Sequence, residues 1–453
     1  MKSEWKEVKV KDILYTTDYV ANGSFAALKE NVTYKDTPDH AILIRLVDFN
    51  AGWNGEFKYV DKSSYEFLKK SYVEPQDVIV SNVGANVGTV FQAPKIDKPM
   101  TLGPNSILIR PENNDEVERD YIYYYFTSRY GQSKISAIVS GSAQPKFNKT
   151  DFRTIDLLLP PFSTQRKIAH ILSTLDDKIE LNRKMNQTLE EMAQALFKSW
   201  FVDFDPVHAK AKCSSDEELE TVACELGIAK EVLDLFPSEF EESELGMIPK
   251  GWELKTIKDF GKVVTGKTPS KKIEDAYDIK GKPFVTPTDI DDSLFVINTA
   301  RYLSDIGQKA VKNSMLPGGS ICVTCIGSQM GKTTVTPVDS ISNQQINSII
   351  PTKGHFRNYL LCNLRGRKKE IFLLGSGGGS TMPLLNKTSF EKVDVLQPSI
   401  NIIEAFDCIV KDNITLILHN DINNNTLQKI RDTLLPKLLA GELDVSELDL
   451  DPE

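Results

Sequence analysis

One glycine-rich segment is similar to a loop that binds nucleotide phosphates. Residues 325–333 read Cys-Ile-Gly-Ser-Gln-Met-Gly-Lys-Thr. A P-loop surrounds phosphates with backbone N–H groups and a lysine, and it needs four residues between its two glycines. Only three separate Gly327 from Gly331, and Ile326 stands where the first glycine is required. The spacing therefore argues against nucleotide hydrolysis, but Lys332, beside a glycine turn, is still suited to contact a phosphate.

Two other patterns are those of methyltransferases and nucleases. Residues 159–162 read Leu-Pro-Pro-Phe, similar to the Pro-Pro-aromatic loop of amino-methyltransferases. In that loop an Asn, Asp or Ser accepts a hydrogen bond from the target amino group, which leucine cannot do. Asp39, Glu56 and Lys58 fit the carboxylate-plus-lysine pattern of metal-dependent nucleases. This pattern arises often by chance, so a metal-dependent nuclease is retained only as an alternative.

The cysteines and histidines show no metal-ligand spacing. Cys322 and Cys325 form a single C-x-x-C, whereas a zinc ribbon needs two such pairs. Their segment has the composition of a strand, which favours ordinary packed thiols. The five histidines are scattered along the chain. We therefore predict a chain with no catalytic residue and with no metal or cofactor of its own.

The overall charge argues, at first, against a nucleic-acid partner. The 453 residues correspond to about three domains, and 40% hydrophobic residues are enough for sizeable cores. With 54 Lys and Arg against 63 Asp and Glu, the formal net charge is -9. The sequence has no signal region and no run of about 18 apolar residues, so we expect a cytoplasmic protein without a membrane span.

The two halves of the chain repeat each other, which indicates a duplicated architecture. Residues 141–160 align with 379–398 at a constant offset of 238 positions. A pair of glycines, Gly84 and Gly88, returns 243 positions later. Each half begins with short β-branched and aromatic runs broken by Gly, Pro, Asn and Asp, which predicts an α+β globular domain.

Each predicted domain leads into a long segment with a heptad pattern. In residues 165–201 the apolar residues alternate at spacings of four and three, and the same phase recurs 238 positions later. At about 1.5 Å per residue the first helix is on the order of 55 Å long, more than one domain could bury. We therefore expect the two helices to bury each other along a seam. The seam residues are Leu172, Leu175, Ile179, Asn182, Asn186 and Leu189 in the first helix and Ile417, Asn420, Asn424 and Leu427 in the second.

The predicted fold class is α+β, with two pseudo-twofold-related globular domains separated by two long antiparallel helices that form a coiled-coil spacer. In antiparallel packing Asn186 would meet Asn420 and Asn182 would meet Asn424, which gives up stability to fix the register. The alternative is two separate amphipathic helices, each lying on its own domain.

Three motifs make the chain resemble the DNA-specificity (S) subunit of type I restriction-modification enzymes over essentially its whole length. They are residues 196–207 (LFKSWFVDFDPV), 236–253 (a Phe-Pro leading to LGMIPKGWE) and 434–443 (LLPKLLAGEL). The chain departs from the family pattern at the start of the second helix, where Pro398 is followed by Ile403-Glu404 instead of the usual Glu-Gln.

The resemblance implies a non-catalytic subunit whose two target-recognition domains each read one half of a bipartite double-stranded DNA target. Its spacer would dock two methyltransferase (modification) subunits, and restriction/translocase subunits would join them. S-adenosylmethionine, ATP and Mg are expected in those partner subunits. The implied segments are target-recognition domain 1 (1–160), the first spacer helix (161–205), an acidic connector (206–248), target-recognition domain 2 (249–398), the second spacer helix (399–441) and an acidic tail (442–453).

Base reading needs amide and guanidinium side chains on loops, with lysines on the phosphates. The DNA-binding candidates follow glycine turns, and each is otherwise a solvated loop residue. They are Asn86, Ser142, Gln144 and Lys146 in the first domain, Lys267, Ser270, Lys271, Lys272, Gln329 and Lys332 in the second, and the glycine-rich loop 375–381. The basic run 365–369 either contacts DNA or is a solvated helix face.

The acidity of the chain is concentrated in two segments. Residues 203–248 contain thirteen acidic and three basic side chains, and residues 442–453 contain six acidic and no basic ones. Without them the remaining chain has a net charge of +7, which is compatible with DNA. A coiled-coil adaptor whose two domains bind proteins is the non-enzymatic alternative.

Overall fold

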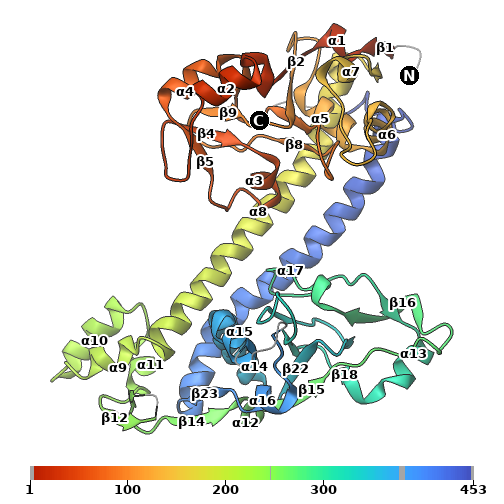
Figure 1. Cartoon of the computed structure of the whole chain (residues 1–453). Coiled ribbons are helices and arrows are strands. Elements are labelled where there is room, and N and C mark those ends of the chain that lie inside the picture. Colours follow the sequence, from red (N-terminus) through yellow and green to blue (C-terminus); the bar gives the residue numbers. More distant parts are fainter. Residues whose placement is uncertain (1–4, 245, 377–382, 450–453) are drawn as a thin grey trace. The chain divides into compact units, whose positions relative to one another are not determined.

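The computed structural model describes residues 5–244, 246–376 and 383–449. These residues divide into two compact units, and the boundary between the units crosses both long helices. Unit 1 ends at Lys178 and resumes at Leu427, and unit 2 runs from Ile179 to Thr426. The sequence-based division gave each helix a segment of its own, whereas each unit combines one α+β domain with part of both helices (Figure 1).

The domain of unit 1 contains two main sheets. A four-stranded antiparallel sheet has the order β2-β10-β7-β8, and a five-stranded sheet has the order β3-β5-β4-β9-β6 with β4 and β9 parallel. The first and last strands, β1 and β11, pair with each other. The strands are β1 (Lys6–Lys9), β2 (Leu14–Asp18), β3 (Tyr34–Lys35), β4 (Ala41–Ile44), β5 (Lys58–Val60), β6 (Tyr72–Val73), β7 (Val78–Ser81), β8 (Val90–Gln92), β9 (Met100–Leu102), β10 (Ser106–Pro111) and β11 (Asp156–Leu159). The helices are α1 (Val10–Ile13), α2 (Phe25–Asn31), α3 (Leu46–Asn50), α4 (Lys62–Phe67), α5 (Arg119–Thr127), α6 (Arg129–Ile138) and α7 (Lys149–Arg153).

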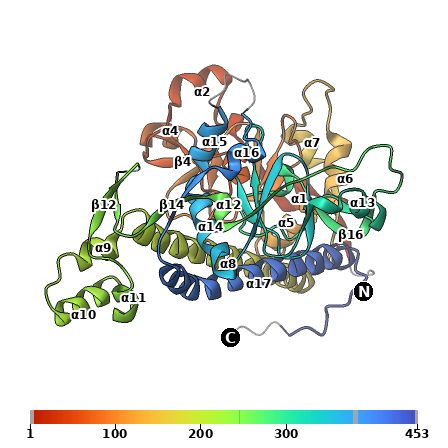
Figure 2. The same cartoon turned by 90° about the horizontal axis from the view of Figure 1, so that it is seen from below.

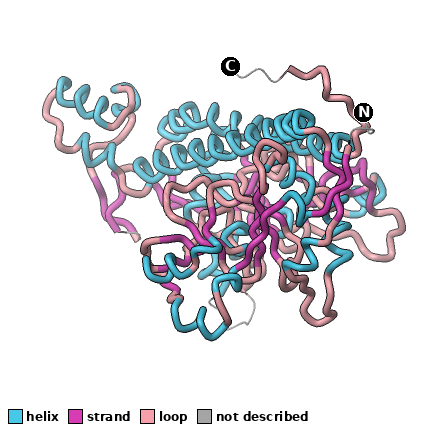
Figure 3. The backbone as a smooth tube through the Cα atoms, turned by 90° about the horizontal axis from the view of Figure 1, so that it is seen from above, coloured by secondary structure: helices cyan, strands magenta, loops and turns pink. Residues whose placement is uncertain are grey.

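The domain of unit 2 repeats most of this topology, with the four-stranded sheet β17-β16-β21-β18 in place of the five-stranded one. Its sheet β15-β22-β19-β20 corresponds to β2-β10-β7-β8, the parallel pair of β16 and β21 corresponds to that of β4 and β9, and β14 pairs with β23 as β1 does with β11. The strands are β14 (Glu253–Thr256), β15 (Gly261–Thr265), β16 (Tyr277–Val285), β17 (Tyr302–Leu303), β18 (Met315–Leu316), β19 (Ile321–Thr324), β20 (Thr333–Val335), β21 (Ser340–Ser342), β22 (Ile346–Pro351) and β23 (Asp394–Gln397). The helices are α12 (Ile257–Phe260), α13 (Asp305–Ala310), α14 (Gly354–Gly366), α15 (Lys368–Ser376) and α16 (Lys387–Glu391). Figure 3 shows the mixture of strands and helices that the α+β prediction requires.

The two long helices have equal length and equal phase. Helix α8 (Phe162–Phe201) and helix α17 (Ile400–Leu439) each have 40 residues, and their first residues are 238 positions apart. Helix α8 ends four residues before the predicted boundary at 205. It ends there because the Asp203 amide donates to the Lys198 carbonyl oxygen and Phe204 adopts a left-handed conformation with φ 55°.

A buried glutamine anchors the start of α8, at the position where the family pattern has its glutamine. The buried Gln165 side chain accepts from the Glu118 amide (2.9 Å) and donates to the carbonyl oxygens of Glu116 and Pro160. It therefore ties the first helical turn to the loop before α5. The equivalent residue in α17 is Ile403, which is fully buried in an apolar cluster. Apolar packing thus replaces the polar anchor where the sequence departs from the family.

Within unit 2 the helices pack antiparallel through a polar layer. Asn182 donates to Asn424 (2.8 Å), and Asn420 donates to Asn186 (2.8 Å). These are the pairs that the heptad register predicts. Asn186 also donates to the Asp421 carboxylate (2.7 Å), a contact that the sequence analysis did not anticipate.

Within unit 1 the same two helices also run antiparallel. Leu172 of α8 and Leu438 of α17 belong to one buried cluster with the domain core. Arg431 forms an ion pair with Asp176 (2.6 Å), and Asp176 also accepts a hydrogen bond from the Tyr124 hydroxyl of α5 (2.8 Å). The helices therefore bury each other, as predicted, and each also packs on a domain, so the alternative of two separate helices is wrong.

The acidic connector is folded. It contains helices α9 (Asp205–Lys210), α10 (Asp216–Glu225) and α11 (Lys230–Asp234) and the hairpin of β12 (Phe240–Ser243) with β13 (Gly246–Pro249), which Figure 2 shows beside the end of α8. The Trp200 and Phe236 rings pack edge to face, which attaches it to α8. Part of the acidic tail is also docked, because Val445 is buried in the core of unit 1.

We predict that replacing Asn182 and Asn424 together with leucine stabilises the chain by about 1–3 kcal/mol, because an apolar pair needs no desolvation of amides. Asn182→Leu alone should destabilise it, because the amide of Asn424 would stay buried without its partner. Thermal unfolding of the three proteins measures both effects. A double variant that melts below the single one would contradict this account of the seam.

A second prediction concerns the Asp421 carboxyl group. Burial raises its pKa to about 6, the carboxylates of Asp291 and Glu190 add to the rise, and the hydrogen bond from Asn186 opposes it. Its Oδ2 atom is buried without a hydrogen-bond partner. A carboxyl group whose pKa is higher in the folded than in the unfolded state binds its proton more strongly when the chain is folded. The group therefore favours folding at a pH below its unfolded pKa, and this contribution is lost as the pH rises through the folded pKa of about 6.

Asp421→Asn should therefore stabilise unit 2 at pH 8 by about 1–2 kcal/mol, after a discount for partial exposure, and by clearly less at pH 5. Urea unfolding at the two pH values measures the difference. Asp412→Asn, at an exposed position of the same helix, is the matched control and should show no such pH dependence. Equal stabilisation by Asp421→Asn at both pH values would refute the assignment.

Candidate nucleic-acid interface

In unit 1 the predicted DNA-binding residues lie on two loops that are hydrogen bonded to each other. The Gly84 amide donates to the Pro145 carbonyl oxygen (2.9 Å), and the Phe147 amide donates to that of Asn82 (3.1 Å). The Asn82 side chain donates in turn to the Phe147 carbonyl oxygen (3.0 Å). We call residues 82–89 and 140–147 loop pair 1. It brings together Asn86, Ser142, Gln144 and Lys146, all exposed.

Unit 2 contains the equivalent loops with the same backbone bond. The Gly327 amide donates to the Pro383 carbonyl oxygen (3.0 Å), and the Leu385 amide donates to that of Cys325 (2.9 Å). We call residues 325–332 and 383–386 loop pair 2. It carries the exposed Gln329. Of the predicted glycine-rich loop 375–381, residues 377–381 lie outside the described residues.

A glycine is required at the first turn of each loop pair. Gly84 has φ +99° and Gly327 has φ +89°, conformations that side chains with a Cβ atom rarely adopt. The turn of loop pair 2 leads into strand β20, whereas a P-loop leads into a helix. Lys332 donates from Nζ to the Ile290 carbonyl oxygen (3.1 Å) and is half-buried. The glycine pattern therefore builds a turn between two strands and not a nucleotide-binding loop.

The remaining candidates of the second domain are connected to loop pair 2 through the turn 342–345. Lys267 donates its amide to the Ser342 carbonyl oxygen (2.8 Å), and the amide of Cys325 donates to the Gln345 carbonyl oxygen (2.8 Å). The loop after β15 is thereby held beside loop pair 2. It carries Lys267, Ser270, Lys271 and Lys272, all exposed.

The basic run at the end of α14 is mostly occupied by internal contacts. Arg367 forms a two-pronged ion pair with Glu370 and donates to the Asp394 carbonyl oxygen. Arg365 binds Glu190 of α8 and three backbone carbonyl groups. Lys368 and Lys369 are exposed. Both arginines therefore have structural contacts, and neither is a free DNA-binding group.

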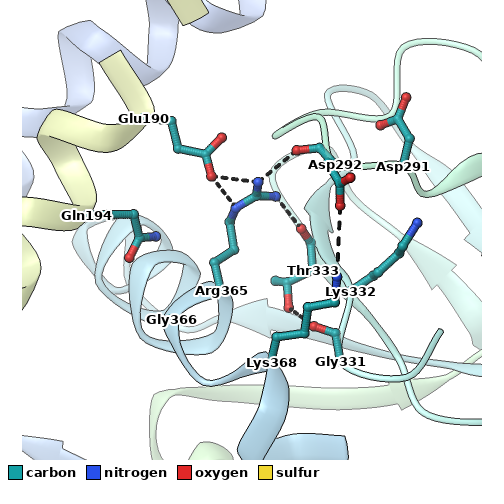
Figure 4. A pocket seen from close by; sticks show the side chains of 10 residues that line it. All are labelled: Glu190, Gln194, Asp291, Asp292, Gly331, Lys332, Thr333, Arg365, Gly366 and Lys368. Carbon is teal, nitrogen blue, oxygen red and sulfur yellow. Dashed lines mark hydrogen bonds and ion pairs between the residues drawn. The ribbon is translucent and has the colours of Figure 1, made fainter. Parts of the chain in front are cut away.

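A polar pocket of about 240 Å³ lies where loop pair 2, α14 and α8 meet (Figure 4). It is lined by Glu190, Gln194, Asp291, Asp292, Gly331, Lys332, Thr333, Arg365, Gly366 and Lys368. Burial raises the pKa of the Glu190 carboxyl group, and the Arg365 guanidinium opposes that rise. Acidic and basic groups are mixed in the lining, so the pocket has no single charge preference.

The other chemical patterns resolve into ordinary contacts. Burial raises the pKa of both the Cys322 and Cys325 thiols to about 11, as expected for packed thiols. Asp39 pairs with Lys35, while Lys58 pairs with Asp36, so this acid and this lysine do not face a shared cation. Among the described residues, no group of three His, Cys, Asp or Glu side chains is arranged as metal ligands. None of the described helices is long and apolar enough to cross a membrane.

Comparison with known proteins decides the family. Residues 2–191 and 249–432 match the type I restriction modification DNA specificity domain. The chain belongs to this family. It is 33% identical to the specificity subunit of the type I restriction enzyme HindI from Haemophilus influenzae, over 97% of this chain and 100% of that protein. It is 28% identical to the MjaIX specificity subunit from Methanocaldococcus jannaschii, over 87% of this chain and 85% of that protein.

The fold agrees with the family. The type I restriction-modification S subunit from M. genitalium superposes with a TM-score of 0.56 at 15% identity, over 96% of both chains. This specificity subunit is therefore the DNA-recognition component of a type I restriction-modification system and not its catalytic component. Neither the protein-binding adaptor nor the metal-dependent nuclease agrees with that assignment.

Three functional contacts were missed by the sequence analysis. Asn82, which ties loop pair 1 together, precedes a predicted turn and was not distinguished from other loop amides. Asp421 follows a predicted seam residue but does not lie on the seam itself. The ion pair of Arg365 with Glu190 joins residues 175 positions apart. No local pattern reveals such a pair, although Glu190 directly follows the seam residue Leu189.

Proposed function

We propose that each domain of this specificity subunit reads one half of a bipartite double-stranded DNA target with its loop pair. The observation that carries the proposal is that one backbone frame is built twice, with the Gly84–Pro145 and Gly327–Pro383 hydrogen bonds in equivalent places. The exposed side chains on the two frames differ. A constant frame with different exposed side chains suits two domains that read different base sequences.

The chemistry of the exposed groups supports this assignment. Amide side chains such as Gln144 and Gln329 can pair with both edge groups of an adenine in the major groove. Lysines such as Lys146 and Lys267 suit phosphates, which position the protein without carrying sequence information. In the first domain Gln144 and Lys146 lie on loop pair 1, and in the second Lys267 lies on the loop that is held beside loop pair 2, so one approach of the duplex would engage both kinds of group in each domain.

The spacer offers a docking face for the modification subunits. In unit 2 one flank of the paired helices faces the domain: Glu190 contacts Arg365, and Asp407 contacts Asn358 (2.7 Å). Each heptad contributes two seam residues, and the residue just before the first of them lies beside the seam. In an antiparallel pair these positions of the two helices lie together on the opposite flank. Those positions hold exposed apolar residues, namely Met185 and Met192 on α8 and Ile409 and Leu416 on α17. We call them the apolar flank, and it is the surface we assign to a methyltransferase subunit.

The wider assembly follows from the same proposal. Two methyltransferase subunits would dock, and restriction/translocase subunits would join them. S-adenosylmethionine, ATP and Mg would act in these partners, and the complex would act in the cytoplasm. The test of the function is methylome sequencing of cells that express the full chain with its modification subunit. A bipartite methylated motif supports the proposal, and a continuous motif or none contradicts it.

For the reading loops, Gln144→Ala should relax specificity at one half-site, and Gln329→Ala should relax it at the other. Loss of a bidentate amide–base pair costs about 1–3 kcal/mol of discrimination. Competition binding of the complex with duplexes mutated in either half measures this. Lys267→Ala is the matched contrast: it should weaken all sequences alike and reduce the salt slope by about one. If Gln144→Ala and Gln329→Ala affect the same half-site, the assignment of one half-site to each domain is wrong.

For the docking face, Met185→Glu with Met192→Glu should prevent stable assembly with the modification subunit, because two charges would replace the exposed apolar contact. The expected result is dissociation during size-exclusion chromatography with an unchanged melting temperature of the free chain. Gln187→Glu, on α8 away from the apolar flank, adds a charge to the same helix and should leave assembly intact. Assembly by the double methionine variant would place the partner elsewhere.

A further inference from the structure

The Arg365 guanidinium joins three separate elements of unit 2. Its Nε donates to the Glu190 carboxylate of α8 at 2.6 Å. Its Nη1 donates to the Thr333 carbonyl oxygen at 2.8 Å, and its Nη2 donates to that of Asp292 at 2.8 Å. Figure 4 shows these bonds converging on the single side chain, which is only 15% exposed.

Two of these contacts fix the exit from loop pair 2. Thr333 is the first residue of β20 and directly follows Lys332. The Lys332 amino group binds the Ile290 carbonyl oxygen, two residues before Asp292. The reading loop and the 290–292 segment are thus held to each other by Lys332 and to α8 by Arg365. A planar guanidinium with several donors in a fixed arrangement is suited to such a junction.

The ion pair is a second point of attachment between the domain and the spacer. The first point is apolar: Tyr359 of α14 packs against Phe197 and Phe201 of α8, with ring centroids 5.5 and 5.0 Å apart. Glu190 lies seven residues before Phe197, which is about 10 Å along the helix. One point of attachment leaves a domain free to pivot, whereas two points fix its direction along the helix.

Unit 1 also contains a contact between a carboxylate of α8 and a helix of its domain. Asp176 of α8 accepts from the Tyr124 hydroxyl group of α5, and α5 follows the sheet of its domain as α14 follows that of unit 2. In each unit, therefore, a carboxylate of α8 binds a helix of the domain, namely α5 in unit 1 and α14 in unit 2.

We propose that Arg365 and Glu190 are positioning residues that hold loop pair 2 in a fixed place along the spacer and thereby set the gap allowed between the two half-sites. The proposal rests on the proposed function, because a gap exists only if each domain reads one half-site. Neither residue contacts a base. Their effect is on where the second set of bases must lie relative to the first.

The variants must separate positioning from folding. Arg365→Met alone would leave the half-buried Glu190 carboxylate without its partner, so it is combined with Glu190→Gln. Glu190→Gln alone keeps an acceptor oxygen for Arg365 and serves as the conservative variant. The matched control is Arg367→Met with Glu370→Gln, which removes an ion pair from the same region that touches neither α8 nor loop pair 2.

The experiment measures binding of the full complex, with its modification subunits, to duplexes that carry the motif found by methylome sequencing. The gap between half-sites is the natural one or is longer or shorter by one base pair. The wild-type complex should prefer the natural gap by about tenfold or more. The Arg365→Met/Glu190→Gln variant should lose most of that preference, to about threefold or less, while keeping its preference for the bases in each half-site. Glu190→Gln and the control pair should keep the wild-type preference.

The outcomes distinguish the two proposals. If the wild type prefers one gap and the double variant keeps the same preference with an unchanged melting temperature, the positioning role is overturned and the proposed function stands. If the double variant loses base preference and gap preference together, Arg365 acts through general folding, and the positioning role is also overturned. If the wild type has no gap preference, the positioning role is overturned, whereas the proposed function is overturned only if changes in one half-site leave binding unchanged.

Discussion

The structure depends on the burial of two apolar stripes, each carried by a helix of 40 residues. At about 60 Å such a helix is longer than one small domain can cover. Each helix must therefore be covered partly by the other. In unit 1 the cover is apolar around Leu172 and Leu438, and in unit 2 it includes the amide pair of Asn182 with Asn424. Amides fit only when their partners are opposite them, so they permit one register where leucines would permit several.

Burial of the seam leaves two flanks of the paired helices in unit 2, and the sequence gives them opposite chemistry. One flank carries Glu190, Asp407 and Asp421, and its carboxylates receive hydrogen bonds from Arg365, Asn358 and Asn186. The other flank carries exposed methionine and branched aliphatic side chains. Polar groups make directional contacts and suit a domain that must keep its orientation. Apolar groups tolerate small shifts and suit a partner that associates from solution.

Periodicity and repetition made most of the fold predictable from the sequence. The heptad phase identified the seam and its asparagine pairs, and the offset of 238 gave the second helix the length of the first. The glycine pairs identified one loop of each loop pair. The end of α8 was not predictable, because the left-handed Phe204 packs against Phe240 of the folded connector. The pairing of Arg365 with Glu190 was equally inaccessible, because it depends on how α14 packs against α8.

Charge distribution connects the fold to DNA binding. The acidic residues that dominate the total charge lie in a folded connector and in a partly docked tail, where they have structural positions of their own. The rest of the chain has a net charge of only +7, and that charge is shared between two domains and two helices. Affinity for duplex DNA grows with the number of phosphates neutralised. An excess of positive charge this small gives each domain few phosphate contacts. Under the proposed function, partner subunits would add the positive surface that tight binding needs, while the side chains on the two loop pairs would discriminate between sequences.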